Sequence, residues 1–389
     1  MKILSKALTK ISLPLLAFVL AVFSGGILIA FSDREVLPLI GSPWKFFTAA
    51  LHSAGNAYLA LFQGSIFDSN LVKDGSFLRG FYPLSESLLI ATPLILAGLS
   101  VTLAFKAGLF NIGAQGQFIF GAIGASYIGF SFDLPPVFHV LLALITAIVF
   151  SALWGGFVGL LKAKTGAHEV IVTIMLNYVA TFFLLWLLKT HIFLRPRALN
   201  PLAPPVHDSA KLPQFLGSGV RLNIGIFIAI LATYFVWWLL NRSTWGFRFR
   251  AVGANAAAAR TAGISVAFVT TAVMAISGAL AGLGGAVQTL GSQFELTPDV
   301  AGSFGFDAIT VALLGRANPI GTVFAAILFG ALRAGGLTMQ ANTQNPIDIV
   351  LVIQALIVLF ISAPELVKFI FRLKGIKSGT SVTSKGWNG

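Results

Sequence analysis

The chain has 389 residues, of which 57% are hydrophobic and 10% are charged, and its formal net charge is +13 at pH 7. Soluble domains carry about 25% charged residues, so this composition excludes an ordinary soluble protein. The apolar residues form runs of about 20, the length that crosses a bilayer as a helix. These runs are longer than the roughly 10-residue strands of a membrane barrel. We therefore predict an all-α polytopic membrane protein.

The apolar runs predict about ten transmembrane helices. If the N-terminus is cytoplasmic, more of the lysines and arginines fall in short segments on that same side, as the positive-inside rule requires. Both termini are then expected in the cytoplasm. The eighth run is short and rich in glycine, so it need not cross as a plain helix. The predicted spans cover residues 11–31, 84–105, 112–131, 137–161, 169–189, 222–240, 264–290, 302–315, 319–336 and 347–371.

The segments between the runs complete the predicted domain organisation. We expect residues 1–371 to form a single transmembrane domain and the polar residues 372–389 to form a cytoplasmic tail. Two long external segments are expected, 32–83 and the proline-rich 190–221. The first includes an apolar stretch suited to a helix along the membrane interface. The longest cytoplasmic connection covers 241–263.

Several kinds of chemistry have no motif in this sequence. Cysteine is absent and the five histidines are scattered, so we expect no disulfide and no metal site. A nucleophile elbow and the GxxxxGK[ST] phosphate loop are also missing. We therefore expect no catalytic residue, no cofactor bound by this chain and no ATP hydrolysis of its own. The positive charge fits basic loops facing an anionic membrane surface, and not nucleic acid.

Polar side chains interrupt the third span, in the stretch FKAGLFNIGAQGQFIFGAIGA. Asn111 and Gln115 are four residues apart and would share a face of a helix. Amides donate and accept hydrogen bonds without net charge, and Phe118 offers a ring that can stack. We interpret Asn111, Gln115, Gln117 and Phe118 as candidates to line a pathway for a neutral solute. Hydrogen bonding that only holds helices together is the alternative.

Two further spans carry polar residues at membrane depth. Glu169, Thr173, Asn177 and Thr181 recur every four residues, so they form a stripe that should face the bundle interior and not lipid. Asn177 is deep enough to line the pathway, whereas Glu169 also fits an interfacial carboxylate at a helix N-terminus. Asp307, in GSFGFDAITVALLGR, is a second pathway candidate, with helix N-terminal bonding as its alternative.

The cytoplasmic connection NRSTWGFRFRAVGANAAAARTAGISV predicts a short docked helix. Asn255 can cap a helix over 256–262, and Gly263 can end it. A helix of that length is marginal in water alone, so we expect it to pack on something. A basic loop that binds lipid headgroups is the alternative.

Five motifs, in order over residues 84–371, resemble the membrane permease subunits of bacterial ABC importers, in the branch that serves nucleosides, simple sugars and branched-chain amino acids. Their order and spacing are most similar to the nucleoside type. The motifs are FKAGLFNIGAQGQFIFGAIGA, HEVIVTIMLNYVA, RAVGANAAAARTAGISV, GFDAITVALLGRANPIGTVFAAILFGALRAGG and DIVLVIQALIVLFI.

The resemblance implies partners that this chain does not contain. These are an ABC ATPase subunit that hydrolyses ATP, a second homologous permease, and a periplasmic or lipoprotein substrate-binding protein, assembled at the bacterial cytoplasmic (inner) membrane. The third motif looks like the family's coupling helix, which docks on the ATPase. It carries Arg250, Gly253, Asn255, Arg260 and Gly263.

The sequence departs from the family pattern at two places and leaves the solute open. The family usually has an acid where Gln115 stands, and a proline and an acid where Ala256 and Ala257 stand. Few charges in the middle spans favour a neutral nucleoside over an amino acid, with a simple sugar or branched-chain amino acid as the alternatives. An ion-coupled secondary transporter that uses Asp307 and Glu169 is the alternative from another class.

Overall fold

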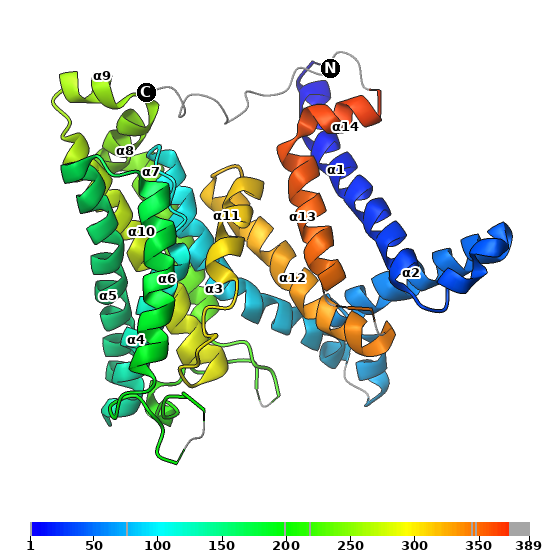
Figure 1. Cartoon of the computed structure of the whole chain (residues 1–389), viewed down its shortest axis with the longest axis horizontal. Coiled ribbons are helices and arrows are strands. Elements are labelled where there is room, and N and C mark those ends of the chain that lie inside the picture. Colours follow the sequence, from blue (N-terminus) through cyan, green and yellow to red (C-terminus); the bar gives the residue numbers. More distant parts are fainter. Residues whose placement is uncertain are drawn as a thin grey trace. The chain divides into compact units, whose positions relative to one another are not determined.

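The computed structural model describes residues 2–74, 77–197, 200–217, 219–343, 345–346 and 348–372 (Figure 1). All regular elements in these ranges are helices, apart from an isolated antiparallel bridge between Gln214 and Asn223. The chain divides into two compact units, Met1–Ser87 with Leu328–Gly389, and Leu88–Ile327. The boundaries fall inside two long helices, α3 (Tyr82–Lys106) and α12 (Pro319–Thr343). The predicted tail lies outside the described residues, except for Arg372.

The first unit is built around α1 (Lys2–Ser32), which contacts both α2 (Pro43–Ser65) and α13 (Asp348–Ser362). The apolar stretch expected to form a helix within 32–83 lies in α2. The tenth predicted span is wrong as a single helix, because α13 ends before Ala363 and α14 (Pro364–Ile370) begins there. Proline lacks an amide donor and is most easily accepted in the first turn of a helix, which is the position of Pro364 in α14.

The second unit is a helical bundle that contains the candidate site (Figure 1). Its centre is α4, which contacts α5, α6, α10 and α11, and fourteen of its 18 residues are buried. The helices of this unit are α4 (Ala114–Ser131), α5 (Pro136–Thr165), α6 (Glu169–Leu187), α7 (Gly225–Arg242), α8 (Thr244–Ala254), α9 (Ala256–Thr261), α10 (Val266–Gln288) and α11 (Phe304–Leu314), with a π-turn at Thr289–Gln293.

Glycines bring the backbones of α4, α5 and α10 together. A Cβ on Gly121 of α4 would lie 2.3 Å from the Cα of Gly282, and one on Gly155 of α5 would lie 3.1 Å from the Cα of Gly278. No side chain fits in either gap, so only glycine allows this spacing. These glycines therefore pack α4, α5 and α10 closely against one another. This packing surrounds α4 with protein, which lets α4 carry amides that lipid would penalise.

Six helical segments in the described part of the chain are long and apolar enough to cross a membrane. The helix α4 is not one of them, because its amides and glycines lower its hydropathy, and α11 is short, as the sequence predicts for that run. The number of ten spans and the cytoplasmic position of both termini stay predictions. The six segments are Phe77–Lys106, Pro136–Thr165, Glu169–Leu187, Gly225–Arg242, Val266–Gln293 and Pro319–Thr343.

Candidate functional site

The candidate site is organised around residues 107–113, which we call the α3–α4 linker. Gly108 adopts φ +72°, a left-handed conformation that ends α3, and the amide of Leu109 donates back to the Ala104 carbonyl at 3.0 Å. Glycine at this position is the usual way to stop a helix. The linker then runs without regular structure until α4 begins at Ala114. The expected helical face shared by Asn111 and Gln115 is therefore wrong, because Asn111 precedes the helix.

Asn111 fastens the linker to α4 through a reciprocal pair of hydrogen bonds with Gln117. The Asn111 Nδ2 donates to the Gln117 Oε1 at 2.9 Å, and the Gln117 Nε2 donates to the Asn111 Oδ1 at 3.1 Å. Asn111 also donates to the Ser100 hydroxyl at 3.2 Å and accepts from the Gly113 amide at 3.1 Å. Both amides are 0% exposed. In this conformation they join the linker to α4 and are closed off from solvent.

Gln115 joins the start of α4 to the start of α11. Its Nε2 donates to the Gly302 carbonyl at 2.7 Å, and its Oε1 accepts from the Gly305 amide at 2.8 Å. A carboxylate has no donor when ionised, so only the amide can make both bonds. Next to this clamp, the buried ring of Phe118 stacks on Phe304, with centroids 5.5 Å apart.

The polar stripe of α6 holds the other side of the linker. The Asn177 Nδ2 donates to the Ile112 carbonyl at 2.9 Å, and its Oδ1 accepts from the Gly116 amide at 2.9 Å. Thr173 is fully buried beside Gly113. The prediction that this stripe faces the bundle interior is confirmed for Glu169, Thr173 and Asn177.

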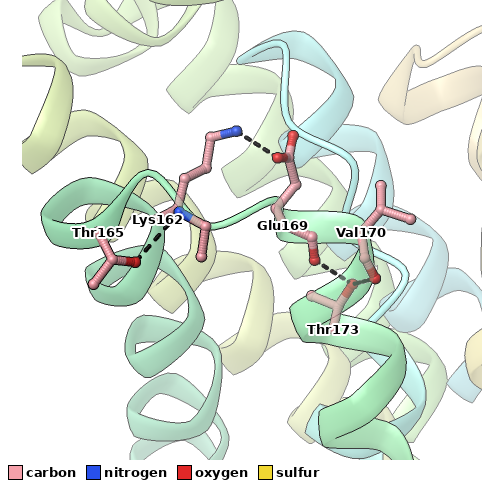
Figure 2. Close-up of polar contacts among 6 residues, drawn as sticks. Lys162, Thr165, Glu169, Val170 and Thr173 are labelled. Carbon is pink, nitrogen blue, oxygen red and sulfur yellow. Dashed lines mark hydrogen bonds and ion pairs between the residues drawn. The ribbon is translucent and has the colours of Figure 1, made fainter.

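Glu169 ties α5 to the linker at the first turn of α6. Figure 2 shows the Lys162 ammonium of α5 reaching the Glu169 carboxylate, and the hydroxyl of Thr173 turned back to the Glu169 carbonyl at 2.7 Å. The backbone of Phe110 lies close to the same carboxylate. Glu169 therefore pairs with one cation beside the linker, and its place in the first turn of α6 matches the preference for a negative charge at a helix N-terminus.

Asp307 lies in the first turn of α11 and is partly buried. The hydroxyl of Ser303 donates to its Oδ2 at 2.9 Å. This geometry is the one expected for a carboxylate at a helix N-terminus. A direct role for Asp307 in the pathway stays a prediction.

The connection after α7 folds as two short helices, α8 and α9, which Figure 1 shows together at one end of this unit. Asn255 lies between them, and its Oδ1 accepts from the Ala258 amide at 3.0 Å, so it caps α9 as predicted. Gly263, at φ +79°, follows the end of α9. The helix α8 was not predicted. Arg250, Gly253, Asn255, Arg260 and Gly263 are all exposed.

A groove of about 570 Å³ runs between α8 and α9. Its walls combine small apolar side chains with one aromatic ring, a cation and an amide. This groove suits the edge of another protein better than a small ligand, because it is shallow and bordered by exposed arginines. Among the residues that line it are Phe247, Arg248, Ala251, Asn255, Ala258 and Ala262.

The backbone of α8 touches the α3–α4 linker at two glycines. A Cβ on Gly253 would lie 2.7 Å from the Lys106 carbonyl oxygen and 2.8 Å from the Gly108 amide nitrogen. A Cβ on Gly108 would lie 2.9 Å from the Gly253 Cα. The connection 241–263 and the amide-bearing linker are therefore in direct main-chain contact.

Comparison with known proteins identifies the family. The model of the branched-chain amino acid transport system / permease component matches residues 84–362. The chain belongs to this permease family. The guanosine ABC transporter permease protein NupP of Bacillus subtilis is 36% identical over 94% of this chain and 97% of its own length. The nucleoside ABC transporter permease protein NupB of Lactococcus lactis is 37% identical over 78% of this chain and 85% of its own.

Other relatives of this permease include one named for glucose and a second permease from each of the same two bacteria. A glucose ABC transporter permease of Haloferax volcanii is 35% identical over 84% of the chain and 88% of its own length. A second nucleoside permease of Lactococcus lactis, NupC, and a second guanosine permease of Bacillus subtilis, NupQ, each match at 28% identity over 63% of the chain. No solved structure matches the permease.

Sequence reasoning missed several residues of this site in the permease. The partner of Glu169 was not predicted, although Lys162 precedes Glu169 by seven residues across the turn at Gly166. Gly108 follows the last charged residue of α3, which is a helix-stop signal. Ser100 and Gly305 could not be identified from the sequence. Ser100 contributes its hydroxyl to Asn111 and Gly305 contributes its backbone amide to Gln115, and only the fold brings these groups together.

Proposed function

We propose that this chain is the membrane-spanning subunit of an ATP-driven importer, and that it forms the pathway for a nucleoside or a related neutral solute. The observation that carries the proposal is the closed cluster of amides around the α3–α4 linker, in contact with an exposed basic helix pair. The relatives named for guanosine and nucleoside transport support the solute class. A simple sugar is the second candidate, supported by the glucose permease among the relatives.

Energy for import comes, in this proposal, from a separate ATPase subunit. The chain carries no GxxxxGK[ST] motif, so it has no phosphate loop to hold ATP. The ATPase docks at the groove between α8 and α9, where Arg248, Arg250 and Arg260 are exposed around an alanine-rich helix. Such a surface fits an acidic edge of a partner with a shallow apolar centre.

The pathway residues act as a gate in this proposal. Asn111, Gln117 and Phe118 are fully buried, so a solute can meet them only after the helices rock apart. Opening exchanges amide–amide hydrogen bonds for amide–solute ones, and no net charge has to enter the membrane. Gln115, Asn177 and Asp307 border the same cluster on α4, α6 and α11.

The assembly we propose contains a second, homologous permease and an external binding protein or lipoprotein, in the bacterial cytoplasmic membrane. Two bacteria each supply a pair of permeases that match this chain, one at 36–37% and one at 28% identity. Such pairs support a heterodimer of related permeases.

Reconstitution tests the proposed function. The chain, its ATPase, the second permease and the binding protein are placed in proteoliposomes, and uptake of labelled guanosine, uridine, glucose and leucine is measured with ATP inside the vesicles on the ATPase side. We expect nucleoside uptake that requires ATP and all four components. Uptake by this chain alone, driven by a proton or sodium gradient, would instead establish the ion-coupled alternative.

A further inference from the structure

The contact between α8 and the α3–α4 linker leaves no space for any side chain. Around Gly253, the nearest atoms to an added Cβ are main-chain atoms of Ala107, Lys106 and Gly108, at 2.7 to 2.8 Å. Main-chain atoms cannot rotate away as the end of a side chain can. Any displacement of α8 toward the linker is therefore passed on directly.

Gly253 is required for its size and not for its backbone conformation. It lies in α8 and is not among the residues with positive φ. Gly108 differs, because it combines φ +72° with the close approach to Gly253. Glycine in the last turn of a helix lowers its stability relative to alanine, so the close approach is the physical reason to have it there.

The linker leads from this contact directly to the amide cluster. Gly108 is three residues from Asn111, and between them the backbone of Phe110 lies close to the Glu169 carboxylate. Ile112 is held by Asn177 of α6, and Asn111 is held by Gln117 of α4. A movement at Gly108 therefore reaches hydrogen bonds to two helices, α4 and α6, within five residues.

We propose that the Gly253–Gly108 contact transmits movement of the α8–α9 pair to the amide cluster, so that it couples ATP hydrolysis by the partner to opening of the pathway. The inference rests on the proposed function and assigns both glycines as positioning residues. The pair acts as a stiff link, while the hydrogen bonds of Asn111, Gln117 and Asn177 are the elements that rearrange.

The first test replaces Gly253 with alanine in the reconstituted complex. The matched control is Gly156→Ala in α5, where the added Cβ meets only the Ala275 Cβ at 3.4 Å, an ordinary contact. We expect Gly253→Ala to keep binding the ATPase and to hydrolyse ATP. We expect import per ATP hydrolysed to fall by about tenfold, in the range of measured coupling between sites. Gly156→Ala should import as the native permease does.

The second test separates contact from backbone conformation at Gly108. Asparagine tolerates left-handed φ, so Gly108→Asn mainly adds a side chain against Gly253. Gly166 has φ +71° with nothing within 4 Å, and Gly166→Asn is its matched control. We expect only Gly108→Asn to lose import per ATP. The double variant Gly108→Asn/Gly253→Ala should lose no more than the worse single variant, because both disturb one contact.

Three measurements keep these outcomes apart. Size-exclusion elution and thermal unfolding of each purified complex report folding, and co-purified ATPase reports docking. If Gly253→Ala and Gly108→Asn import with native coupling, the inference is overturned while the proposed function stands. If the variants lose coupling only in proportion to lost complex, the contact is structural and the inference is also overturned. Failure of the native complex to import nucleosides would instead count against the proposed function.

Discussion

Asn111 and Gln117 satisfy each other's amide groups, through hydrogen bonds of 2.9 and 3.1 Å in opposite directions. The pair joins a non-helical linker to the first turn of α4, where both side chains are fully buried. A buried amide that loses its partner costs about 1–3 kcal/mol, whereas removing both partners together costs less. The pair is therefore a latch whose two halves can be tested separately.

The first prediction follows from this latch. Asn111→Leu or Gln117→Leu should each lower the free energy of unfolding by about 1–3 kcal/mol, because the remaining amide is left unsatisfied. The double variant should be less destabilised than the sum of the two, by about 0.5–3 kcal/mol. Denaturant unfolding of the detergent-purified permease measures all four proteins.

Nucleoside uptake by the same variants shows whether the two amides only hold the α3–α4 linker or also line the solute pathway. If the amides bind solute when the gate opens, the double variant should lose most of its nucleoside uptake even though it is less destabilised than the sum of the two single variants. Native uptake by the double variant would show that these two amides only hold the linker, and would remove them from the pathway.

The second prediction concerns the clamp made by Gln115. Gln115→Glu keeps the shape but replaces the donor to the Gly302 carbonyl with an acceptor, so two oxygens face each other. We expect a loss of about 1–3 kcal/mol in unfolding free energy and slower import, because the start of α11 is released from α4. Gln340→Glu is the control, since Gln340 is exposed on α12. A fully active and stable Gln115→Glu would mean that the residue is protonated there or that the clamp is dispensable.

How much of this site could be read from the sequence depends on the distance between partners along the chain. The third span was predicted as residues 112–131, and α4 covers Ala114–Ser131, because hydrophobic runs report helices directly. The partner of Asn111 was not predicted. Residues three or four positions apart are neighbours only within a helix, and Gly108 ends α3 before Asn111 is reached. Pairing across six residues of a non-helical linker has no periodicity to reveal it.

The connection 241–263 likewise combines features that the sequence predicts with features that it does not. The cap at Asn255 and the stop at Gly263 were local signals, and both are confirmed. The helix α8 was missed, because its arginines and aromatic residues look like a solvated basic loop when its packing on α7 and α10 is unknown. The contact of Gly253 with Gly108 joins positions 145 residues apart, and glycine carries no side-chain pattern that could indicate it.

The third prediction concerns the ion pair between Lys162 and Glu169. The side chains are 32% and 11% exposed, so this pair is less screened than a surface pair. Glu169→Gln should lower unfolding free energy by about 1 kcal/mol, above the ~0.5 kcal/mol typical of exposed pairs. The control is Asp208→Asn, which removes the exposed pair with Lys211 and should change stability little.

Exchanging the charges of Lys162 and Glu169 tests how much the dipole of α6 contributes to the stability of that ion pair. Lys162→Glu with Glu169→Lys restores opposite charges but puts a cation at the N-terminus of α6, where the helix dipole is unfavourable. We expect partial recovery relative to Glu169→Lys alone, measured by thermal unfolding at low and high salt. Full recovery would mean that the helix dipole contributes nothing to the carboxylate at this position.

The last prediction concerns the cap of α9. Asn255→Ala removes the acceptor for the Ala258 amide, a loss of about 0.5–2 kcal/mol, and a helix of six residues has little else to hold its first turn. We expect the ATPase to bind more weakly and import to fall.

Asn255→Asp keeps the cap but adds a negative charge beside Arg248 in the groove. If the groove receives an acidic edge of the ATPase, Asn255→Asp should weaken binding although α9 stays folded, and Arg260→Glu should weaken it in the same way. Pull-down of the ATPase at several salt concentrations measures both. Undiminished binding by Asn255→Asp together with weak binding by Asn255→Ala would show that the partner recognises the helix through shape, with charge contributing nothing.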